Sequence, residues 1–300
     1  MHSRWYSVSV LLLWLTTMGW LVRQKVWPSL VVGDPPDYQA ILAVQKDSPP
    51  VGWSLVWNDR KNLGWAVTST SPLPNGLTEV RSHVHFSELP LSDIIPEWLS
   101  GLLQPSDSRG IRLTMDARSA LIFDPLRRLS QFESTIRFQP KVDAVKVQGR
   151  IEGARLFLSI HCGDSSPSET DVPAPRNAIL SDALSPLGYL PGLRLGQCWT
   201  VEVYSPLRPP TSPSEILHAA VEAKMPMTWN GRIVDTWEVV YRSDPGSALA
   251  SAGSPRGKLW VRSDGAVLKQ QVTVLRSTLT FVRTSDEEAA LLARKAGDVR

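Results

Sequence analysis

Two histidines one residue apart, His83 and His85, have the residue type and spacing closest to a chemical site. Positions i and i+2 of a strand share a face, so both imidazoles could reach one metal ion. Protein metal sites need three or four ligands, however, and no second His, Cys or carboxylate cluster is evident in the sequence. Glu79 and Arg81 share the same expected face. We therefore predict a solvated polar face, with no metal and no cofactor, and keep the two histidines only as metal candidates.

The adjacent pair His161-Cys162 is a second candidate for chemistry. Neighbouring strand residues point to opposite faces, so these two side chains cannot act together as base and nucleophile. The chain has no G-x-S-x-G elbow and no glycine-rich phosphate loop. We therefore predict no catalytic residue. A hydrolase whose site is assembled from distant strands stays open as an alternative.

The chain contains two cysteines, Cys162 and Cys198. Both lie beside expected strands, and they bracket the polar, Ser- and Pro-rich segment 163–178. A bridge that closes a loop of this size stabilises a fold by roughly 3–4 kcal/mol in the chain-entropy model. We predict a disulfide between them, with two separate buried thiols as the alternative.

Tryptophan is over-represented, with 12 Trp against 5 Tyr and 6 Phe. The pattern W-N-[DG]-R-x4-W-x-V occurs twice, from Trp57 and from Trp229, which predicts two hairpins with a Trp on each strand. The recurrence is either a duplication or a coincidence. We interpret the tryptophans outside the N-terminal segment mainly as core residues, and keep six as candidates for ligand binding: Trp57, Trp65, Trp98, Trp229, Trp237 and Trp260.

The elements that must position these residues are mostly strands. Alternation of apolar and polar residues with period two dominates the chain after residue 37. Asn75-Gly76, Asn230-Gly231 and Asp264-Gly265 are typical hairpin turns. Residues 214–225 precede the Asn230-Gly231 turn and are expected to form a strand, with a helix as the alternative because of their alanine content. Helices are expected at 92–104 and at 285–296, where Ser285 and Glu288 form a capping box.

The N-terminal segment differs from the rest of the chain. Residues 5–22 carry no charge, and 18 apolar residues are just enough to cross a bilayer as a helix. Arg4 and Arg23 flank the segment, and aromatic rings lie near its ends. We predict an uncleaved signal anchor with the rest of the chain outside. A cleaved signal peptide is the alternative.

The composition excludes some partners and suggests six segments. With 32 Lys and Arg against 29 Asp and Glu, the net charge of +3 does not favour nucleic acid. We expect a signal anchor or transmembrane helix at 1–25, a tether at 26–37, a first β unit at 38–163, a linker at 164–178, a second β unit at 179–284 and a C-terminal helix at 285–300. The two β units form either one sheet or two domains.

The C-terminal half contains WVRSDGAVLKQ (260–270), an expected strand, Asp-Gly turn and strand, among the segments 191–207, 227–242 and 277–283. Together these resemble envelope proteins whose strands curl around a helix, broadly like the LolA/LppX lipoprotein-carrier fold. The whole chain also looks like single-span envelope proteins of planctomycete-type bacteria. The resemblance implies an open β half-barrel with an apolar concave face and a lipid or lipopeptide ligand. It brings no catalytic residue, and a helix anchor departs from the soluble or lipid-anchored carriers.

The sequence thus predicts a mainly β (α+β) fold: a transmembrane helix followed by antiparallel sheet in an open half-barrel. We expect a non-catalytic protein of the bacterial inner membrane, single-pass, with most of the chain on the periplasmic side. Its expected partners are the membrane, through residues 5–22, and an apolar ligand or an envelope protein. A structural subunit of an envelope complex is a further alternative.

Overall fold

The computed structural model describes residues 2–22, 36, 41–42, 45, 48–58, 61–90, 112–126, 128–139, 144–163, 167–173, 185–204, 214–243, 255–274 and 277–298. The helix expected at 92–104, which contains Trp98, lies outside the described residues.

One antiparallel sheet of fourteen strands makes up most of the described chain. Its strands are β1 (Val51–Trp57), β2 (Lys61–Pro72), β3 (Thr78–Pro90), β4 (Arg112–Phe123), β5 (Leu129–Gln139), β6 (Ala144–Glu152), β7 (Arg155–Cys162), β8 (Ser168–Pro173), β9 (Cys198–Tyr204), β10 (Ser214–Trp229), β11 (Arg232–Ser243), β12 (Pro255–Arg262), β13 (Val267–Val274) and β14 (Ser277–Arg283). The order across the sheet is β8-β7-β6-β5-β4-β3-β2-β1-β14-β13-β12-β11-β10-β9. Each half of the chain is therefore a meander, and the two halves join where β1 pairs with β14.

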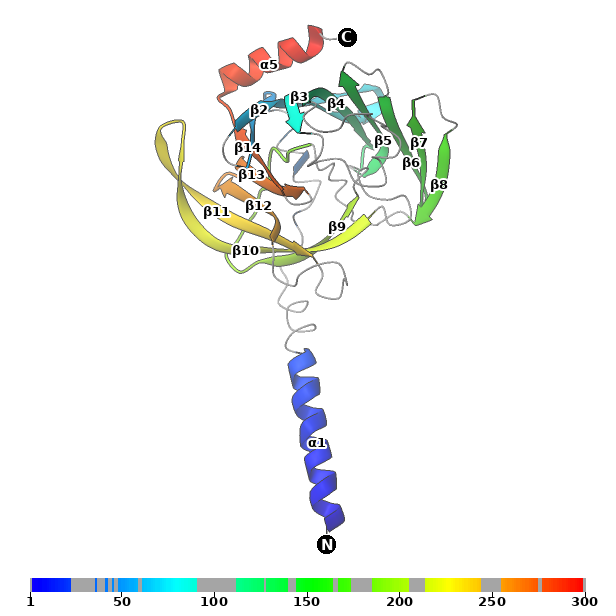
Figure 1. Ribbon diagram of the computed structural model, residues 1–300, viewed down its shortest axis with the longest axis vertical. Coiled ribbons are helices and arrows are strands. Elements are labelled where there is room, and N and C mark those ends of the chain that lie inside the picture. The colour runs from blue at the N-terminus through cyan, green and yellow to red at the C-terminus, as the bar shows by residue number, and fades with distance from the viewer. Residues whose placement is uncertain are drawn as a thin grey trace.

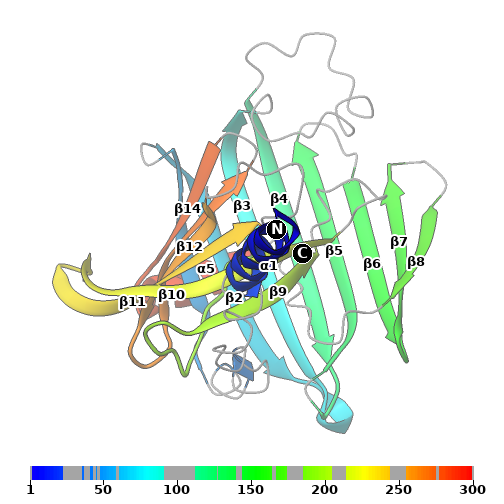
Figure 2. The ribbon, with the colours of Figure 1, turned by 90° about the horizontal axis from the view of Figure 1, so that it is seen from below.

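The sheet curls into an open arch, as Figures 1 and 2 show. Its two edges are β8 and β9, which do not pair with each other, so the arch stays unclosed. The prediction of a mainly β fold with an open antiparallel sheet is confirmed. The two expected β units form one sheet. The strand β8 lies within the segment 164–178 that was expected to be a linker.

The hairpin turns form where the sequence indicates them. In the β10–β11 turn, Asn230 and Gly231 have φ angles of 48° and 72°, and Trp229 lies opposite Arg232 in the register. Positive φ at both central positions is the geometry that matches the twist of a two-residue hairpin. Asn75 adopts φ 62° in the short 3-10 turn η2 (Pro74–Gly76) between β2 and β3. The segment expected as a strand at 214–225 is part of β10, which confirms that prediction.

Side chains alternate between an inner, buried face and an outer face. In β1, the buried Trp53, Leu55 and Trp57 alternate with the less buried Ser54 and Val56. The register continues the inner face onto β14, where Phe281 lies opposite Leu55. Period-two alternation across paired strands therefore gives the sheet one apolar face, which is the core of the protein.

The helix α5 (Asp286–Asp298) covers part of the outer face, over β1 and β2 (Figure 1). It begins as predicted, because Glu288 N donates to Ser285 Oγ at 3.3 Å. Gly52 allows the close approach, since a Cβ there would lie 2.8 Å from Ala289 Cα. Lys295 lies over the Trp65 ring, with Nζ 5.3 Å from the centroid. The expected C-terminal helix is confirmed.

The N-terminal helix α1 (His2–Leu21) projects away from the sheet (Figure 1). Its apolar side chains are exposed, among them Leu13 at 70% and Trp20 at 63%. Within the described part of the chain, no helix is both long and apolar enough to span a membrane. The predicted transmembrane helix is therefore not supported. The helix takes in the polar and charged residues His2, Ser3 and Arg4 at its start, which lowers its mean hydropathy below that of the segment 5–22 alone.

Candidate functional site

The inner face of the sheet is the candidate site for a ligand. It is apolar across both halves of the molecule, with side chains contributed by β1, β3, β4, β5, β9, β11, β12 and β14. Its buried members include Trp53, Leu55, Phe86, Met115, Ile136, Trp199, Val239, Leu259 and Phe281. A sheet of fourteen strands encloses more space than the eight strands whose own side chains fill a barrel. Segments outside the strands therefore also contribute to the interior.

One of these segments is residues 185–194, which we call the strap. Leu190 of the strap is fully buried, and Leu187, Tyr189 and Leu193 pack against the apolar core. The strap pairs with the turn between β12 and β13: Leu190 N donates to Gly265 O at 2.7 Å, and Tyr189 forms a bridge with Ala266. The strap thus lies on the inner face and meets the sheet through a single isolated bridge.

Glycine is required at the point where the strap crosses this turn. Gly265 has φ +88°, a conformation that side-chain-bearing residues rarely adopt. A Cβ there would also lie 2.8 Å from Pro191 Cα. The Asp264-Gly265 turn, noted in the sequence as a hairpin signal, therefore also seats the strap.

Arg283, the last residue of β14, holds the strap from the other side. It is 7% exposed and lies on the inner face opposite Trp53. One terminal nitrogen donates to Gly188 O at 3.0 Å, and the other donates to Tyr189 Oη at 3.0 Å. The guanidinium carbon also lies 4.9 Å from the centroid of the Tyr189 ring. Among the described residues, no carboxylate contacts Arg283.

A second arginine lies beside this contact. Arg262 pairs with both carboxylate oxygens of Asp264, at 2.9 and 2.6 Å, and its guanidinium is 5.7 Å from the Trp229 ring. The hydrogen bonds from Arg262 hold the pKa of Asp264 below its ordinary value. Trp229 Nε1 in turn donates to Arg283 O at 2.9 Å. Arg262 alternates along β12 with the buried Val261, so its pair with Asp264 lies at the outer side of this strand end, whereas the Arg283 guanidinium lies on the inner face.

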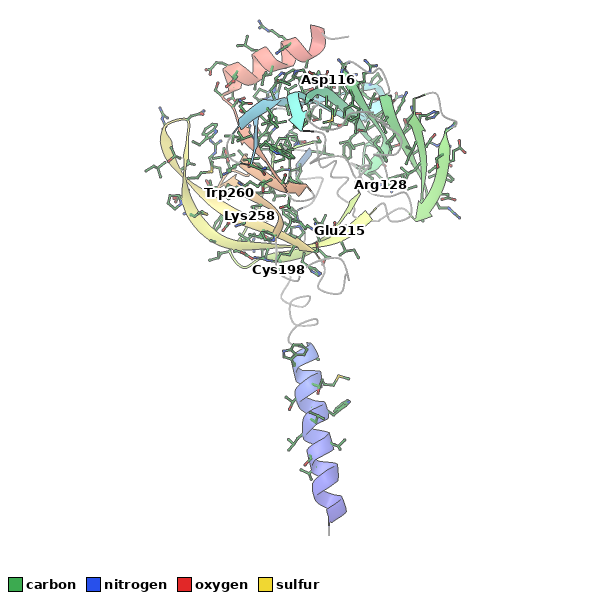
Figure 3. The ribbon with its side chains drawn as sticks, viewed as in Figure 1. Asp116, Arg128, Cys198, Glu215, Lys258 and Trp260 are labelled. Atoms are coloured by element: carbon green, nitrogen blue, oxygen red, sulfur yellow. The ribbon has the colours of Figure 1, made fainter. Side chains whose placement is uncertain are left out.

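A separate polar cluster lies on the outer face, next to α5. Asp116 Oδ1 is 3.1 Å from His83 Nε2 and 2.9 Å from His85 Nδ1 (Asp116 is labelled in Figure 3). An ionised carboxylate only accepts hydrogen bonds, so both ring nitrogens must donate. The remaining His83 Nδ1 is buried and has no hydrogen-bond partner in the part of the chain that the structure describes. The Trp65 ring stacks on His85 and meets His83 edge-on.

Electrostatics keeps His83 neutral and Asp116 charged. Burial lowers the pKa of His83 below its ordinary value, although the hydrogen bond to Asp116 acts in the opposite direction. Burial acts to raise the pKa of Asp116, but the hydrogen bonds from His85 and His83 outweigh it, so that pKa is lowered. The cluster therefore contains a neutral His83 that is hydrogen-bonded to an ionised Asp116.

The prediction that the two histidines lie on a solvated face is therefore corrected, because part of this face is buried. His83 and Glu79 are each 7% exposed, and the Trp65 ring meets His83, whereas Arg81 on the same face is exposed and His85 is half-buried. In the described part of the chain, no group of three His, Cys, Asp or Glu residues has a geometry that could hold a metal ion. The face alternation itself is as expected, with Val84 and Phe86 on the inner side.

The predicted tryptophans do not come together in one site. Trp57 is buried in the core, and Trp237 packs against the core with Lys224 Nζ 6.0 Å from its ring. Trp65 belongs to the histidine cluster, and Trp229 contacts Arg283 and Arg262. Trp260 lies on the outer face of β12, where Lys269 Nζ is 4.8 Å from its ring; Figure 3 shows it far from Asp116.

The predicted disulfide is not formed. Cys198 is a free thiol whose sulfur contacts Gly196 O at 3.5 Å. Its neighbour Trp199 faces the core, so Cys198 points to the outer side of β9. Cys162 is on β7, and β7 and β9 stand near opposite ends of the strand order. The two cysteines flank the same segment of the sequence, but the strands that carry them are not neighbours in the sheet.

One contact in the structure bears on the alternative that the protein is a hydrolase whose site is assembled from distant strands. Ser159 Oγ is 3.3 Å from His161 Nε2, two residues along β7 on the outer face. A nucleophile–base pair needs a third group to orient the imidazole. Among the described side chains, no carboxylate forms a hydrogen bond with His161. This contact does not complete a catalytic arrangement.

Comparisons with known proteins give similarities in fold. No protein-family model matches the chain, and no curated protein matches its sequence. A solved β-barrel-like protein of the domain of unknown function DUF1849 from Brucella abortus covers 80% of this chain and 97% of its own, at 8% identity and a TM-score of 0.46. A DUF1089 family protein from Pseudomonas aeruginosa covers 72% and 91%, at 14% identity and a TM-score of 0.36. A lipoprotein candidate from Parabacteroides distasonis covers 84% and 98%, at 8% identity and a TM-score of 0.24.

Sequence reasoning missed Arg283 and the strap. One signal for Arg283 is present, because Ser277, Leu279, Phe281 and Arg283 occupy the same face of one strand. A charged residue that continues an apolar face is a buried-charge candidate. The strap offers no comparable signal, since its apolar residues follow no strand or helix period.

Proposed function

We propose that the protein is a non-catalytic binding protein that holds an apolar ligand, of the lipid or lipopeptide class, against the inner face of its sheet. The observation that carries this proposal is the apolar face that continues through both halves of an unclosed sheet. Pockets for small molecules are mostly apolar with a few placed polar groups, and the end of this face combines both. A bacterial envelope location and an envelope protein partner are part of the same proposal.

The strap gives this proposal a route for ligand entry. It is held by few hydrogen bonds, from its backbone to Gly265, Val267 and the Gln270 side chain and from Arg283, whereas the strands are held along their whole lengths. Segments with few such contacts open at lower free-energy cost than core strands. A ligand that takes the place of Leu190 and its neighbours would be covered by the same apolar face.

The test is fluorescence of the neutral apolar probe N-phenylnaphthylamine titrated with the full chain. We expect saturable binding that is lost when urea unfolds the protein. Leu190→Ala should increase the affinity, because it removes buried strap contacts from the inner face. Leu195→Ala is the matched control: Leu195 is five residues further on and 61% exposed, so this change should leave binding unaltered.

The proposal fails if the native chain neither binds the probe nor carries lipid that organic extraction and mass spectrometry detect. It also fails if Leu190→Ala and Leu195→Ala change the affinity equally, since binding would then lie elsewhere on the surface. Unfolding curves for both variants establish that the folded protein is being compared.

A further inference from the structure

Arg283 is a buried charge whose described partners are all neutral. A buried guanidinium normally pairs with a carboxylate, because removing it from water is costly unless an opposite charge compensates. Here its two terminal nitrogens instead reach the backbone carbonyl of Gly188 and the hydroxyl of Tyr189. Both acceptors belong to the strap, which is not part of the sheet.

These two contacts imitate the binding of an anion. Each oxygen is 3.0 Å from a different terminal nitrogen of Arg283. Carboxylates and phosphates bind a guanidinium in this way, with two oxygens on two nitrogens. Two strap oxygens therefore stand where the two oxygens of an anionic group would stand.

The nearby carboxylate of Asp264 is engaged by another arginine. Arg262 and Arg283 both lie near Tyr189, and the adjacent carboxylate, Asp264, gives both of its oxygens to Arg262. Asp286, at the start of α5, also acts electrostatically on Arg262, but its side chain is exposed. Among the described residues, Arg283 therefore has no ion-pair partner, and its guanidinium is bound only by neutral oxygens.

A second hydrogen-bond donor is available on the same face. Trp53 lies opposite Arg283 across β1 and β14 and is fully buried, and its Nε1 has no hydrogen-bond partner among the described residues. Buried donors without partners are uncommon in folded proteins and call for an explanation such as an absent ligand. Beyond Trp53, the face is apolar through Leu55 and Phe281.

We propose that Arg283 binds the anionic head group of an amphiphile whose apolar tail lies on the inner face. The Gly188 carbonyl and the Tyr189 hydroxyl occupy the head-group position in the structure. Ligand binding then replaces the strap contact with a charge-assisted, two-pronged hydrogen bond. This inference rests on the proposed function and names the chemical class of its ligand.

The test compares two probes that differ only in the head group, cis-parinaric acid and its methyl ester. Each is titrated into the full chain, with fluorescence as the readout. We expect the acid to bind at least about tenfold more tightly than the ester. Arg283→Gln should abolish this preference while leaving the affinity for the ester within about twofold. An excess of sodium acetate should not displace the acid, because acetate lacks the tail.

Two further variants keep the test decisive. Arg150→Gln removes an equal charge from an outer-face side chain that is 61% exposed, and should leave both affinities unchanged. Tyr189→Phe removes one strap oxygen and should strengthen binding of the acid but not of the ester. This variant tests the inference even if Arg283→Gln does not fold.

The outcomes separate the inference from the proposed function. If neither probe binds, the proposed function fails. If both probes bind equally, or if acetate competes with the acid, the function stands and the anionic amphiphile is wrong. A preference that survives in a folded Arg283→Gln variant, or that Tyr189→Phe leaves unchanged or weakens, also overturns the role of Arg283.

Discussion

At the scale of single residues, the candidates for function are polar side chains at buried positions. His83 follows the outer-face alternation and yet is buried, next to Asp116 and Trp65. Arg283 follows the inner-face alternation and yet is charged. In both cases the strand pattern is intact, and the chemistry arises because a polar side chain sits where water has been removed.

His83 should make stability depend on pH. Its pKa in the folded protein is below the unfolded value of 6.5, so the unfolded chain binds more protons at mildly acidic pH. The free energy of unfolding should therefore fall as pH drops below about 6.5, until the folded pKa is reached, by at most about 1.4 kcal/mol per pH unit. Urea unfolding at a series of pH values measures this slope.

His83→Gln should flatten the slope in that window. His161→Gln, which removes a histidine outside the cluster, should retain it. An equal slope in the wild type and in His83→Gln would show that His83 does not couple folding to pH. The lowered pKa of Asp116 acts separately, since it contributes stability that is lost only at pH values below its unfolded value of 3.8.

At the scale of elements, α5 and the strap dock on opposite faces of the sheet. Each approaches closely because a glycine lies beneath it, Gly52 under α5 and Gly265 under the strap. Ala289 fills the space over Gly52, and Pro191 fills the space over Gly265. Docking of both elements therefore depends on a missing side chain in the strand or turn that receives them.

Gly52→Ala should loosen α5. The added Cβ would lie 2.5 Å from Thr284 Oγ1 and 2.8 Å from Ala289 Cα, and the latter is backbone that cannot simply rotate away. We expect a loss of about 1–3 kcal/mol, as for other overpacked sites. Trypsin should also cleave faster after Arg294 and Lys295, which gel electrophoresis or mass spectrometry can follow.

Gly297→Ala is the control for this change, because nothing lies within 4 Å of the added Cβ. An alanine there should be neutral or stabilise the helix by up to about 1 kcal/mol. The docking argument would be wrong if Gly52→Ala were as stable and as protease-resistant as Gly297→Ala.

At the scale of the whole molecule, the seam between β1 and β14 decides the architecture. Strands neighbouring in sequence pair within each half, whereas the seam joins segments more than 200 residues apart, as in the hydrogen bond from Thr278 N to Asn58 Oδ1. The seam merges the two apolar faces into one, since Trp53, Leu55 and Phe281 lie in the same core. The single face proposed to bind ligand exists only because of this pairing.

Leu55→Ala should weaken both halves together. Leu55 is fully buried at the seam, opposite Phe281, so the substitution should cost about 2–5 kcal/mol. Hydrogen exchange should accelerate in β2–β3 and in β12–β13 alike. Leu126→Ala, at a residue 61% exposed, should change neither. Faster exchange confined to one half would show that the halves are energetically independent.

Much of this protein is encoded locally. Period-two alternation and turns such as Asn230-Gly231 predict strands, hairpins and a mainly β fold, because both signals depend on neighbours in sequence. The capping box at Ser285 predicts α5 for the same reason. These local preferences determined the elements and their order along the chain.

Tertiary structure decided the rest, because burial and pairing between distant strands are not local properties. It placed β1 beside β14, buried His83 on a face expected to be wet, and left Cys198 a free thiol. It also laid an aperiodic strap across the inner face and brought it to Arg283. The sequence by itself indicated most strands and the turns between them, although not β8; only the curl of the sheet determined which side chains meet.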